Sequence, residues 1–218
     1  MQEGIENIRE RPIIYRVGEL LASGVIKKTD DPVKIQNDLN QIIALANSKI
    51  IDRLGTEGPK DGVWIYPIEY QKAMDRLKQA KGDTVIRLIV AANLVKGDPV
   101  LTELEMHPNR VVYQENEFVY QKIYNVPIDG SNSEMLISDF LRNVNMTAIN
   151  NGILPNPLTG TVGVINGNQI YAIEKALAEN RGKDVLISAF AAADTEVLGP
   201  LRLHIYLKNE TEQEINHE

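Results

Sequence analysis

The sequence predicts an α+β fold made by internal duplication of a ββα(β)αββ unit. The main observation is that segment 12–106 aligns with segment 110–207, with Asn47 over Asn145. In addition, each segment contains two stretches with helical spacing of apolar residues and ends in a β-forming run. One unit of this size leaves an apolar sheet face uncovered, so we expect two lobes packed about a pseudo-two-fold axis.

Two strands begin each unit. Residues 13–16 and 19–26 flank Val17-Gly18, and the second unit has Asn116 where the first has Gly18. Glycine and asparagine adopt positive φ more easily than other residues. This shared turn chemistry predicts a β-hairpin in each unit.

A helix follows the strands in each unit. Asp31 and Pro32 indicate an N-cap and a first helical residue, and Ser131-Asn-Ser-Glu134 indicates a capping box. Apolar residues at helical spacing predict the buried faces, namely Val33, Ile35, Leu39, Ile42, Ile43, Ala46 and Ile50 in one unit and Leu136, Ile137, Phe140, Leu141, Val144 and Ala148 in the other.

After a variable loop and a short extended piece, each unit contains a second helix. We expect it at about 67–81, with Gly82 past its end, and at about 168–181, with Asn168 as its N-cap.

Two paired strands close each unit. We expect residues 84–92 to pair with 100–106, and 185–193 with 201–207. The last of these runs alternates apolar residues with polar ones or Tyr206, which is the period of a half-exposed sheet.

The pattern divides the chain into five parts. Lobes at 12–106 and 110–207 are joined by a linker at 107–109, which is too short for a flexible tether. Residues 1–11 are charged and helix-competent, and the acidic segment 208–218 is predicted to be a mobile tail.

Composition excludes several functions. The 218 residues carry a net charge of −7 and include no cysteine, which excludes disulfides, thiolate nucleophiles and zinc–sulfur sites. The sequence has no stripe of lysine and arginine, which argues against nucleic-acid binding. The sequence also has no apolar run of the ~20 residues that a membrane span needs, so we expect the chain as printed to be soluble.

Several stretches resemble a known family. They are Tyr15-Arg-Val-Gly-Glu-Leu-Leu-Ala-Ser-Gly-Val25, Asn151-Gly-Ile-Leu-Pro155 and the residues at 89–98, 108–117 and 191–201. With them, the chain resembles, over 12–207, the C-terminal domain of the chiefly cyanobacterial family known as domain of unknown function 3084.

The resemblance implies a cellular context. Members of that family carry two N-terminal transmembrane segments and a long coiled coil before this domain. The chain therefore looks like an excised C-terminal piece, with residues 1–11 as the end of the coiled-coil helix. The Lys/Arg-rich loop between the membrane segments implies an extracytoplasmic domain by the positive-inside rule, with a cytoplasmic domain as the alternative. A tethered scaffold that forms homo-oligomers in the full-length protein is further implied.

Matched polar residues are the candidate ligand-binding residues. Asn93 and Asp194 follow corresponding strand ends and could contact a metal or a small polar ligand, although two oxygens are too few for a hard cation. The alternative is that both cap a turn. Asn47 and Asn145 lie within helices, where asparagine is unfavourable, so we expect either a buried hydrogen bond or a ligand contact.

No catalytic arrangement is evident. Glu19 and Glu117 form a matched acidic pair, but each directly follows a turn, where exposed charge protects an edge strand. The three histidines lack partners at ligand or triad spacing, so no metal or cofactor is expected. We therefore expect a non-enzymatic domain that binds a protein partner or itself. The alternative is a module that senses a small ligand or metal in a pocket between the lobes, and a metal-dependent hydrolase is the third possibility.

Overall fold

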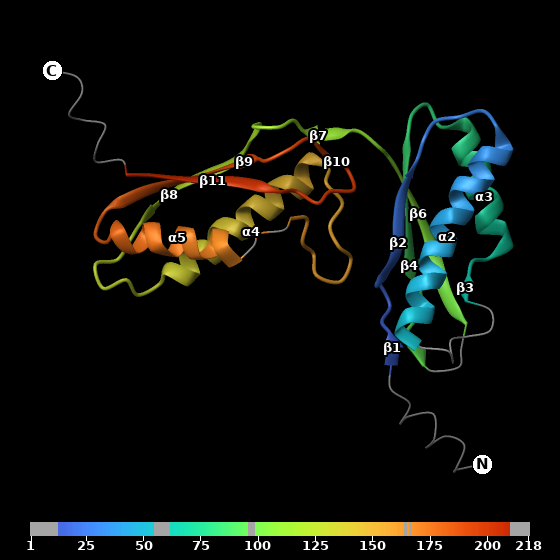
Figure 1. Ribbon diagram of the computed structural model, residues 1–218, viewed down its shortest axis with the longest axis horizontal. Helices are drawn as coiled ribbons and strands as arrows, with labels where there is room; N and C mark the ends of the chain where they lie inside the picture. The colour runs from blue at the N-terminus through green and yellow to red at the C-terminus, as the bar shows by residue number, and fades with distance from the viewer. Residues whose placement is uncertain (1–12, 55–61, 96–98, 164, 166, 210–218) are drawn as a thin grey trace, which may run out of the picture. The chain divides into compact units, whose positions relative to one another are not determined.

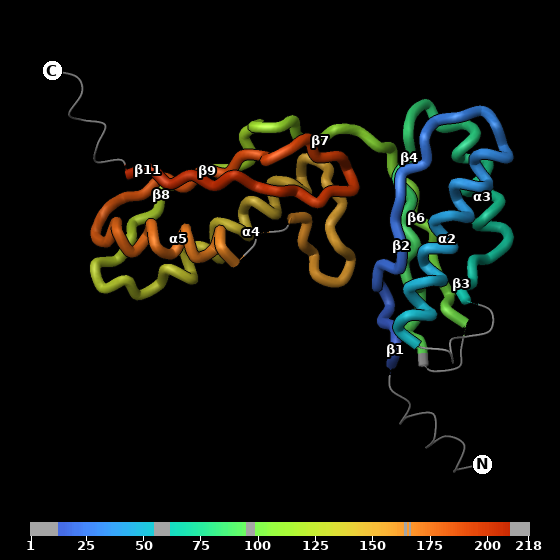
Figure 2. The backbone as a smooth tube through the Cα atoms, viewed as in Figure 1, coloured from blue at the N-terminus to red at the C-terminus, as the bar shows by residue number. Residues whose placement is uncertain are grey.

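The computed structural model describes residues 13–54, 62–95, 99–163, 165 and 167–209 (Figures 1 and 2). The predicted coiled-coil end at 1–11 lies outside the described residues, as does the tail from residue 210 onward. Apart from residues 156–159, the chain divides into two compact units between Asn109 and Arg110. We call them unit 1 and unit 2 and describe each by itself.

Unit 1 is a mixed sheet with two helices on one side (Figure 1). Its elements are β1 (Ile13–Tyr15), β2 (Leu20–Ile26), α2 (Pro32–Leu54), β3 (Val63–Trp64), α3 (Pro67–Gln79), β4 (Thr84–Val90), β5 (Leu94–Val95) and β6 (Val100–Pro108). The main sheet has the order β2-β4-β6-β3, and β1 pairs separately with β5.

The core of unit 1 lies between its helices and the helix side of its sheet. Asp31 caps α2 as predicted, because its carboxylate accepts the Val33 N–H at 2.9 Å. The buried residues on α2 are five of the seven predicted, while Ile43 is half-buried and Val33 is exposed. They pack against alternate residues of β4, which are Ile86, Leu88 and Val90.

Unit 2 has the same order of principal elements. They are β7 (Val111–Tyr113), β8 (Phe118–Asn125), α4 (Ser133–Asn151), α5 (Gly167–Glu179), β9 (Asp184–Ala191), β10 (Thr195–Glu196) and β11 (Leu203–Asn209). The sheet order is β11-β9-β8, and β10 pairs with β7. Gly163 forms a parallel bridge with Leu201, where unit 1 has a parallel pair between β3 and β6.

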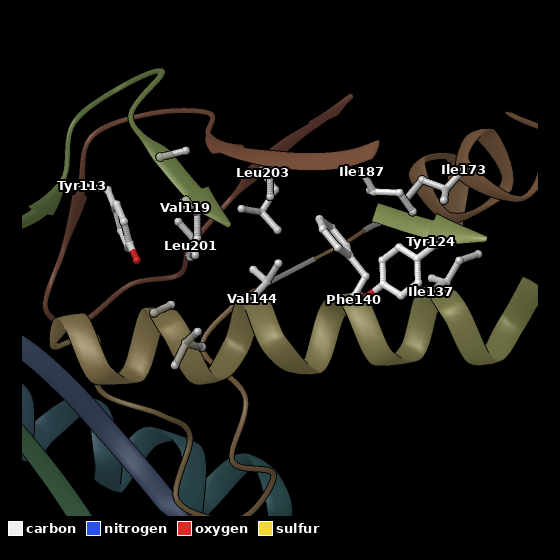
Figure 3. Close-up of a cluster of buried hydrophobic side chains, with 14 of the residues drawn as sticks. Tyr113, Val119, Tyr124, Ile137, Phe140, Val144, Ile173, Ile187, Leu201 and Leu203 are labelled. Carbon is white, nitrogen blue, oxygen red and sulfur yellow. The ribbon is translucent and has the colours of Figure 1, made fainter. Parts of the chain in front are cut away.

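The core of unit 2 centres on α4 and β9. In Figure 3, the side chains of Ile137, Phe140 and Val144 extend from α4 toward the sheet. Phe140 lies 5.7 Å from the Tyr120 ring and 6.4 Å from the Tyr124 ring, measured between centroids. The helix side of β9 supplies Val185, Ile187, Ala189 and Ala191.

The α+β class is therefore confirmed. The predicted final strand pairs are also present, because β4 pairs antiparallel with β6, and β9 with β11. The common origin of the two units and the pseudo-two-fold axis stay predictions.

The predicted hairpins are wrong in their pairing. Arg16 accepts the Glu19 N–H at 3.0 Å, and Gln114 accepts the Glu117 N–H at 3.0 Å, so a tight turn is present in each unit. Gly18 and Asn116 have positive φ, but Val17 and Glu115 do not, as in a type II turn. Such turns splay the flanking strands. In the described ladders, β1 therefore pairs with β5 and β2 with β4, while β7 pairs with β10 and β8 with β9.

The predicted helix ends also need correction. No capping box forms at α4, since its N-cap is Asn132, which has a φ of 101° and makes no side-chain cap bond. At α3, Gly82 lies past the end of the helix as predicted, but the C-cap is Ala80 and Gly82 has no positive φ. Asn168 lies inside α5, which begins at Gly167.

Two further boundaries differ from the prediction. β6 continues through His107 and Pro108, so most of the predicted linker is strand. β11 likewise includes Lys208 and Asn209, which we assigned to the tail. The strand pattern also missed β5 and β10, which have two residues each and so carry no periodicity. Across the described residues, no helix has the length and apolar character needed to cross a membrane.

Candidate functional site

Asn93 and Asp194 both hold the first turn of their own unit. The Asn93 Oδ1 atom accepts the Val17 N–H at 2.9 Å. The Asp194 Oδ1 atom accepts the Glu115 N–H at 2.8 Å. An amide and a carboxylate can replace each other here because only an oxygen acceptor is needed. Both residues therefore stabilise a turn through a hydrogen bond to its backbone, and both are exposed to solvent.

The two matched glutamates close the same turns. Glu19 Oε2 accepts the Arg16 N–H at 3.3 Å, and Glu117 Oε2 accepts the Gln114 N–H at 2.7 Å. Glu19 also forms an ion pair with Arg53, which lies over the Tyr15 ring at 4.4 Å. Each carboxylate thus satisfies a backbone donor of its own turn.

Asn47 and Asn145 anchor the segment that follows each first helix. Asn47 Oδ1 accepts the Val63 N–H at 2.8 Å, and Asn145 Oδ1 accepts the Val162 N–H at 2.9 Å. Asn145 also donates to the Gly160 carbonyl at 2.8 Å. The expected hydrogen bond to the neighbouring loop or strand is therefore present in both units. Each of these bonds joins a candidate residue to backbone, and none joins one candidate to another.

A shallow cavity of about 280 Å³ lies beside Asp194 in unit 2. It is lined by Asp194, Glu196, Arg202 and the residues around the cis peptide Gly199–Pro200. The lining carries both carboxylate and guanidinium groups, so a small zwitterionic or polar molecule would find complementary partners there. Among the described residues, no three His, Asp or Glu side chains gather in a way that could hold a metal ion.

A charged cluster around Asp139 was not predicted from the sequence. Its carboxylate accepts hydrogen bonds from Lys122 at 2.8 Å, Tyr124 at 2.8 Å and Arg142 at 3.1 Å. These bonds, that of Lys122 first, lower the pKa of Asp139 to about 2. Burial, followed by the nearby Asp139, raises the pKa of Tyr124. The i, i+2 spacing on β8 and the i, i+3 spacing on α4 could have indicated this cluster.

The sheet face of unit 2 that points away from its helices carries large apolar side chains. We call the apolar residues of this surface the aromatic face, namely Phe118, Ile123, Leu186, Phe190 and Tyr206, and the strand register places Gln121, Ser188, His204 and Lys208 on the same side. Phe190 meets Phe118 at 5.8 Å and Tyr206 at 5.7 Å in edge-to-face geometry. Exposed fractions are 48% for Phe118, 48% for Ile123 and 57% for Tyr206.

The sequence does contain a signal for this face. The core residues of β9 alternate with Leu186, Ser188 and Phe190, so apolar side chains occupy both sides of the strand. A half-exposed strand ordinarily places polar residues on its second side.

The corresponding face of unit 1 is charged at its centre. Arg87 stands between Ser23 and Glu105 in the strand register. Its Nε atom lies 3.1 Å from the Glu105 carboxylate, and its side chain is only 7% exposed. His107 approaches the same carboxylate at 3.5 Å.

No protein-family model matches the chain, and no similar curated protein or solved structure was found.

Proposed function

We propose that this chain is a non-enzymatic protein-interaction domain and that the aromatic face of unit 2 is its contact surface. The observation that carries the proposal is the run of half-exposed apolar side chains across three neighbouring strands. Covering these apolar side chains removes the free-energy cost of their hydration. Contiguous exposed apolar patches on folded proteins mark interaction sites.

The composition of the aromatic face supports a protein partner. Tyrosine and phenylalanine are enriched in the buried centres of protein interfaces, where charged residues are depleted. Tyr206 presents both an apolar ring and a hydroxyl, so it can fill a pocket and still satisfy its polar end. The matched polar residues, by contrast, are engaged in the turns and loops of their own units.

The family resemblance supports a setting for this domain. In that setting the domain sits at the end of a membrane-anchored coiled coil, on the extracytoplasmic side, in a homo-oligomeric full-length protein. A cytoplasmic position is the alternative. The aromatic face then serves either a protein partner or a second copy.

Site-specific photo-crosslinking tests the proposed surface. The protein with a photoreactive phenylalanine analogue at position 206 should give a discrete cross-linked species in the cells that naturally produce it. The same analogue at Tyr171, which is 67% exposed on α5 of the same unit, is the matched control. Equal labelling at both positions would contradict the proposal.

A small-ligand sensor is the second candidate function, and the cavity beside Asp194 favours it. A thermal-shift screen with nucleotides, divalent metals and oligosaccharide fragments tests it, since a ligand that binds only the folded state raises the melting temperature. The shift should disappear in Asp194→Ala if the cavity is the site. A screen without any shift would count against this candidate.

A further inference from the structure

A groove runs between α5 and β11 in unit 2, beside the aromatic face. It has a volume of about 220 Å³ and is lined by Gln169, Ala172 and Ile173 from the helix and by residues 204–207 from the strand. Ala172 and Tyr206 are exposed, and Ile205 is half-buried. Among the described lining residues, none carries an acidic group, a lysine or an arginine.

The edge of β11 opens into this groove. In the described ladders, β11 pairs with β9 and with no other strand. The Arg202 carbonyl accepts the Ala192 N–H at 2.9 Å, and the Leu203 carbonyl accepts the Gln169 side chain at 2.8 Å from the helix side. Backbone groups alternate in direction along a strand, so the N–H and C=O groups of Ile205 and Leu207 point toward the groove.

The chain already places extended backbone along this edge. Gly163 forms a parallel bridge with Leu201, just before β11. In unit 1, β3 pairs in parallel with the start of β6 through Val63 with Val100 and Trp64 with Leu101. In both units, an extended segment pairs with the closing strand near its start. The rest of that strand edge extends beyond the paired segment.

We propose that the groove binds an extended segment of a partner protein, which adds a strand to β11. This inference rests on the proposed function and names the form of its partner. Strand addition satisfies the backbone groups of Ile205 and Leu207, and pockets for alternate side chains provide specificity. The segment should be uncharged where it faces Ala172 and Ile173, and apolar or aromatic where it faces Tyr206, because unpaired charge is costly against such surfaces.

Unit 1 provides a matched groove of opposite chemistry. It lies between α3 and β6, has a volume of about 280 Å³ and is lined by Glu69, Lys72, Ala73, Arg76 and residues 103–106. Lys72 occupies the place of Ala172, and Glu103 and Glu105 occupy those of His204 and Tyr206. The same apolar segment should not bind there.

Peptide selection on the intact chain tests the proposal. A displayed library of random twelve-residue peptides should yield sequences with alternating apolar residues. A synthetic selected peptide should bind at least tenfold more weakly to Ala172→Trp, which fills the groove. The matched Lys72→Trp substitution on α3 should leave its affinity unchanged. N-methylation of alternate peptide bonds should weaken binding tenfold in one register and not in the other.

Several results would overturn the proposal. They are no selected peptide, equal binding to both tryptophan variants, or insensitivity to N-methylation. Sedimentation that shows a dimer dissociated by Ala172→Trp would assign the groove to a second copy. Tenfold tighter peptide binding by a chain ending at Asn209 would assign it to the chain's own C-terminal residues. If cross-linking at position 206 persists in Ala172→Trp, the proposed function stands without strand addition.

Discussion

The two units share their hydrogen-bonding framework and differ in the chemistry of their surfaces. Asn93 and Asp194 hold equivalent turns, and Asn47 and Asn145 anchor equivalent segments. On the sheet faces away from the helices, however, unit 1 has Arg87 with Glu105, and unit 2 has Phe190 with Tyr206. Residues that satisfy buried or turn backbone are restricted by geometry, whereas residues on an open face are free to diverge. Residues matched between the units therefore maintain the shared fold, and unmatched residues are the better guide to function.

The largest expected effect is the loss of stability when a core side chain is truncated, and its size should differ between the two units. Phe140→Ala removes a ring that is 1% exposed, so it should lower the free energy of unfolding of unit 2 by about 3–5 kcal/mol. Ile42→Ala, at the corresponding place on α2, should cost about 2 kcal/mol because a smaller side chain is lost. Urea unfolding measures both, with Trp64 fluorescence reporting unit 1 and circular dichroism reporting the whole chain. A larger loss of unfolding free energy in Ile42→Ala than in Phe140→Ala would contradict the expectation that the larger aromatic side chain contributes more.

The anchoring asparagines should give the next largest effect. Asn145→Ala should destabilise unit 2 by about 1–2 kcal/mol, because it leaves a backbone donor and a backbone carbonyl without their partner. Asn47→Ala should cost about 1 kcal/mol, since one acceptor bond, that from the Val63 N–H, is lost among the described residues. Urea midpoints check both values.

Substitution by aspartate distinguishes the two anchoring asparagines. Asn47→Asp keeps the oxygen that accepts the Val63 N–H, so it should be close to neutral. Asn145→Asp loses the donor to the Gly160 carbonyl and should remain destabilised. Equal behaviour of the two aspartate variants would contradict the described geometry.

The turn residues should give a smaller effect. Asp194→Ala should cost about 0.5–1 kcal/mol, and Asp194→Asn almost nothing, because the amide oxygen can accept the same Glu115 N–H. Asn93→Ala and Asn93→Asp should follow the same order in unit 1. Thermal melts of the four variants test this equivalence, and a large loss in Asp194→Asn would require a role for its charge.

The smallest effect is a dependence on pH that belongs to unit 2. Hydrogen bonds from Lys122, Tyr124 and Arg142 lower the pKa of Asp139 from 3.8 to about 2. A lowered folded-state pKa stabilises the fold above the ordinary value and loses that contribution as pH falls toward 2. Urea midpoints should therefore fall more steeply between about pH 4 and 2 in the wild type than in Asp139→Asn.

Unit 1 supplies the control for the pH experiment. It has Gln41 at the corresponding helical place, so Gln41→Ala should leave the acid dependence of the urea midpoint unchanged. Parallel curves for the wild type and Asp139→Asn would mean that the cluster contributes nothing to stability.

The sequence predicted the elements with strong periodicity and missed those without it. The faces of α2 and α4 and the pairing of the closing strands follow from apolar spacing over seven or more residues. β5 and β10 contain two residues each and have no such signal. The hairpins were misassigned because glycine and asparagine indicate a positive φ but not which strands that turn brings together.

The candidate site shows the same limit. The matched positions of Asn93, Asp194, Asn47 and Asn145 were visible in the alignment of the two halves, and one explanation offered for the asparagines was a hydrogen bond. The acceptors and donors themselves could not be named, since each bond joins residues far apart in the sequence. The residues of the aromatic face could not be named from the sequence, because the exposure of Phe118 and Tyr206 depends on what covers each side of the sheet.

The α+β class, the order of the main elements and most of the helix residues that fill each core follow from the sequence alone, because they depend on local periodicity. The pairing of the first strands in each unit, the hydrogen-bond partners of the matched polar groups and the open sheet face are known only from the three-dimensional arrangement. Those outcomes depend on contacts between distant segments, and the free energy of burying a side chain is set by its neighbours in space. The open edge of β11 and the rings beside it became visible only in that arrangement.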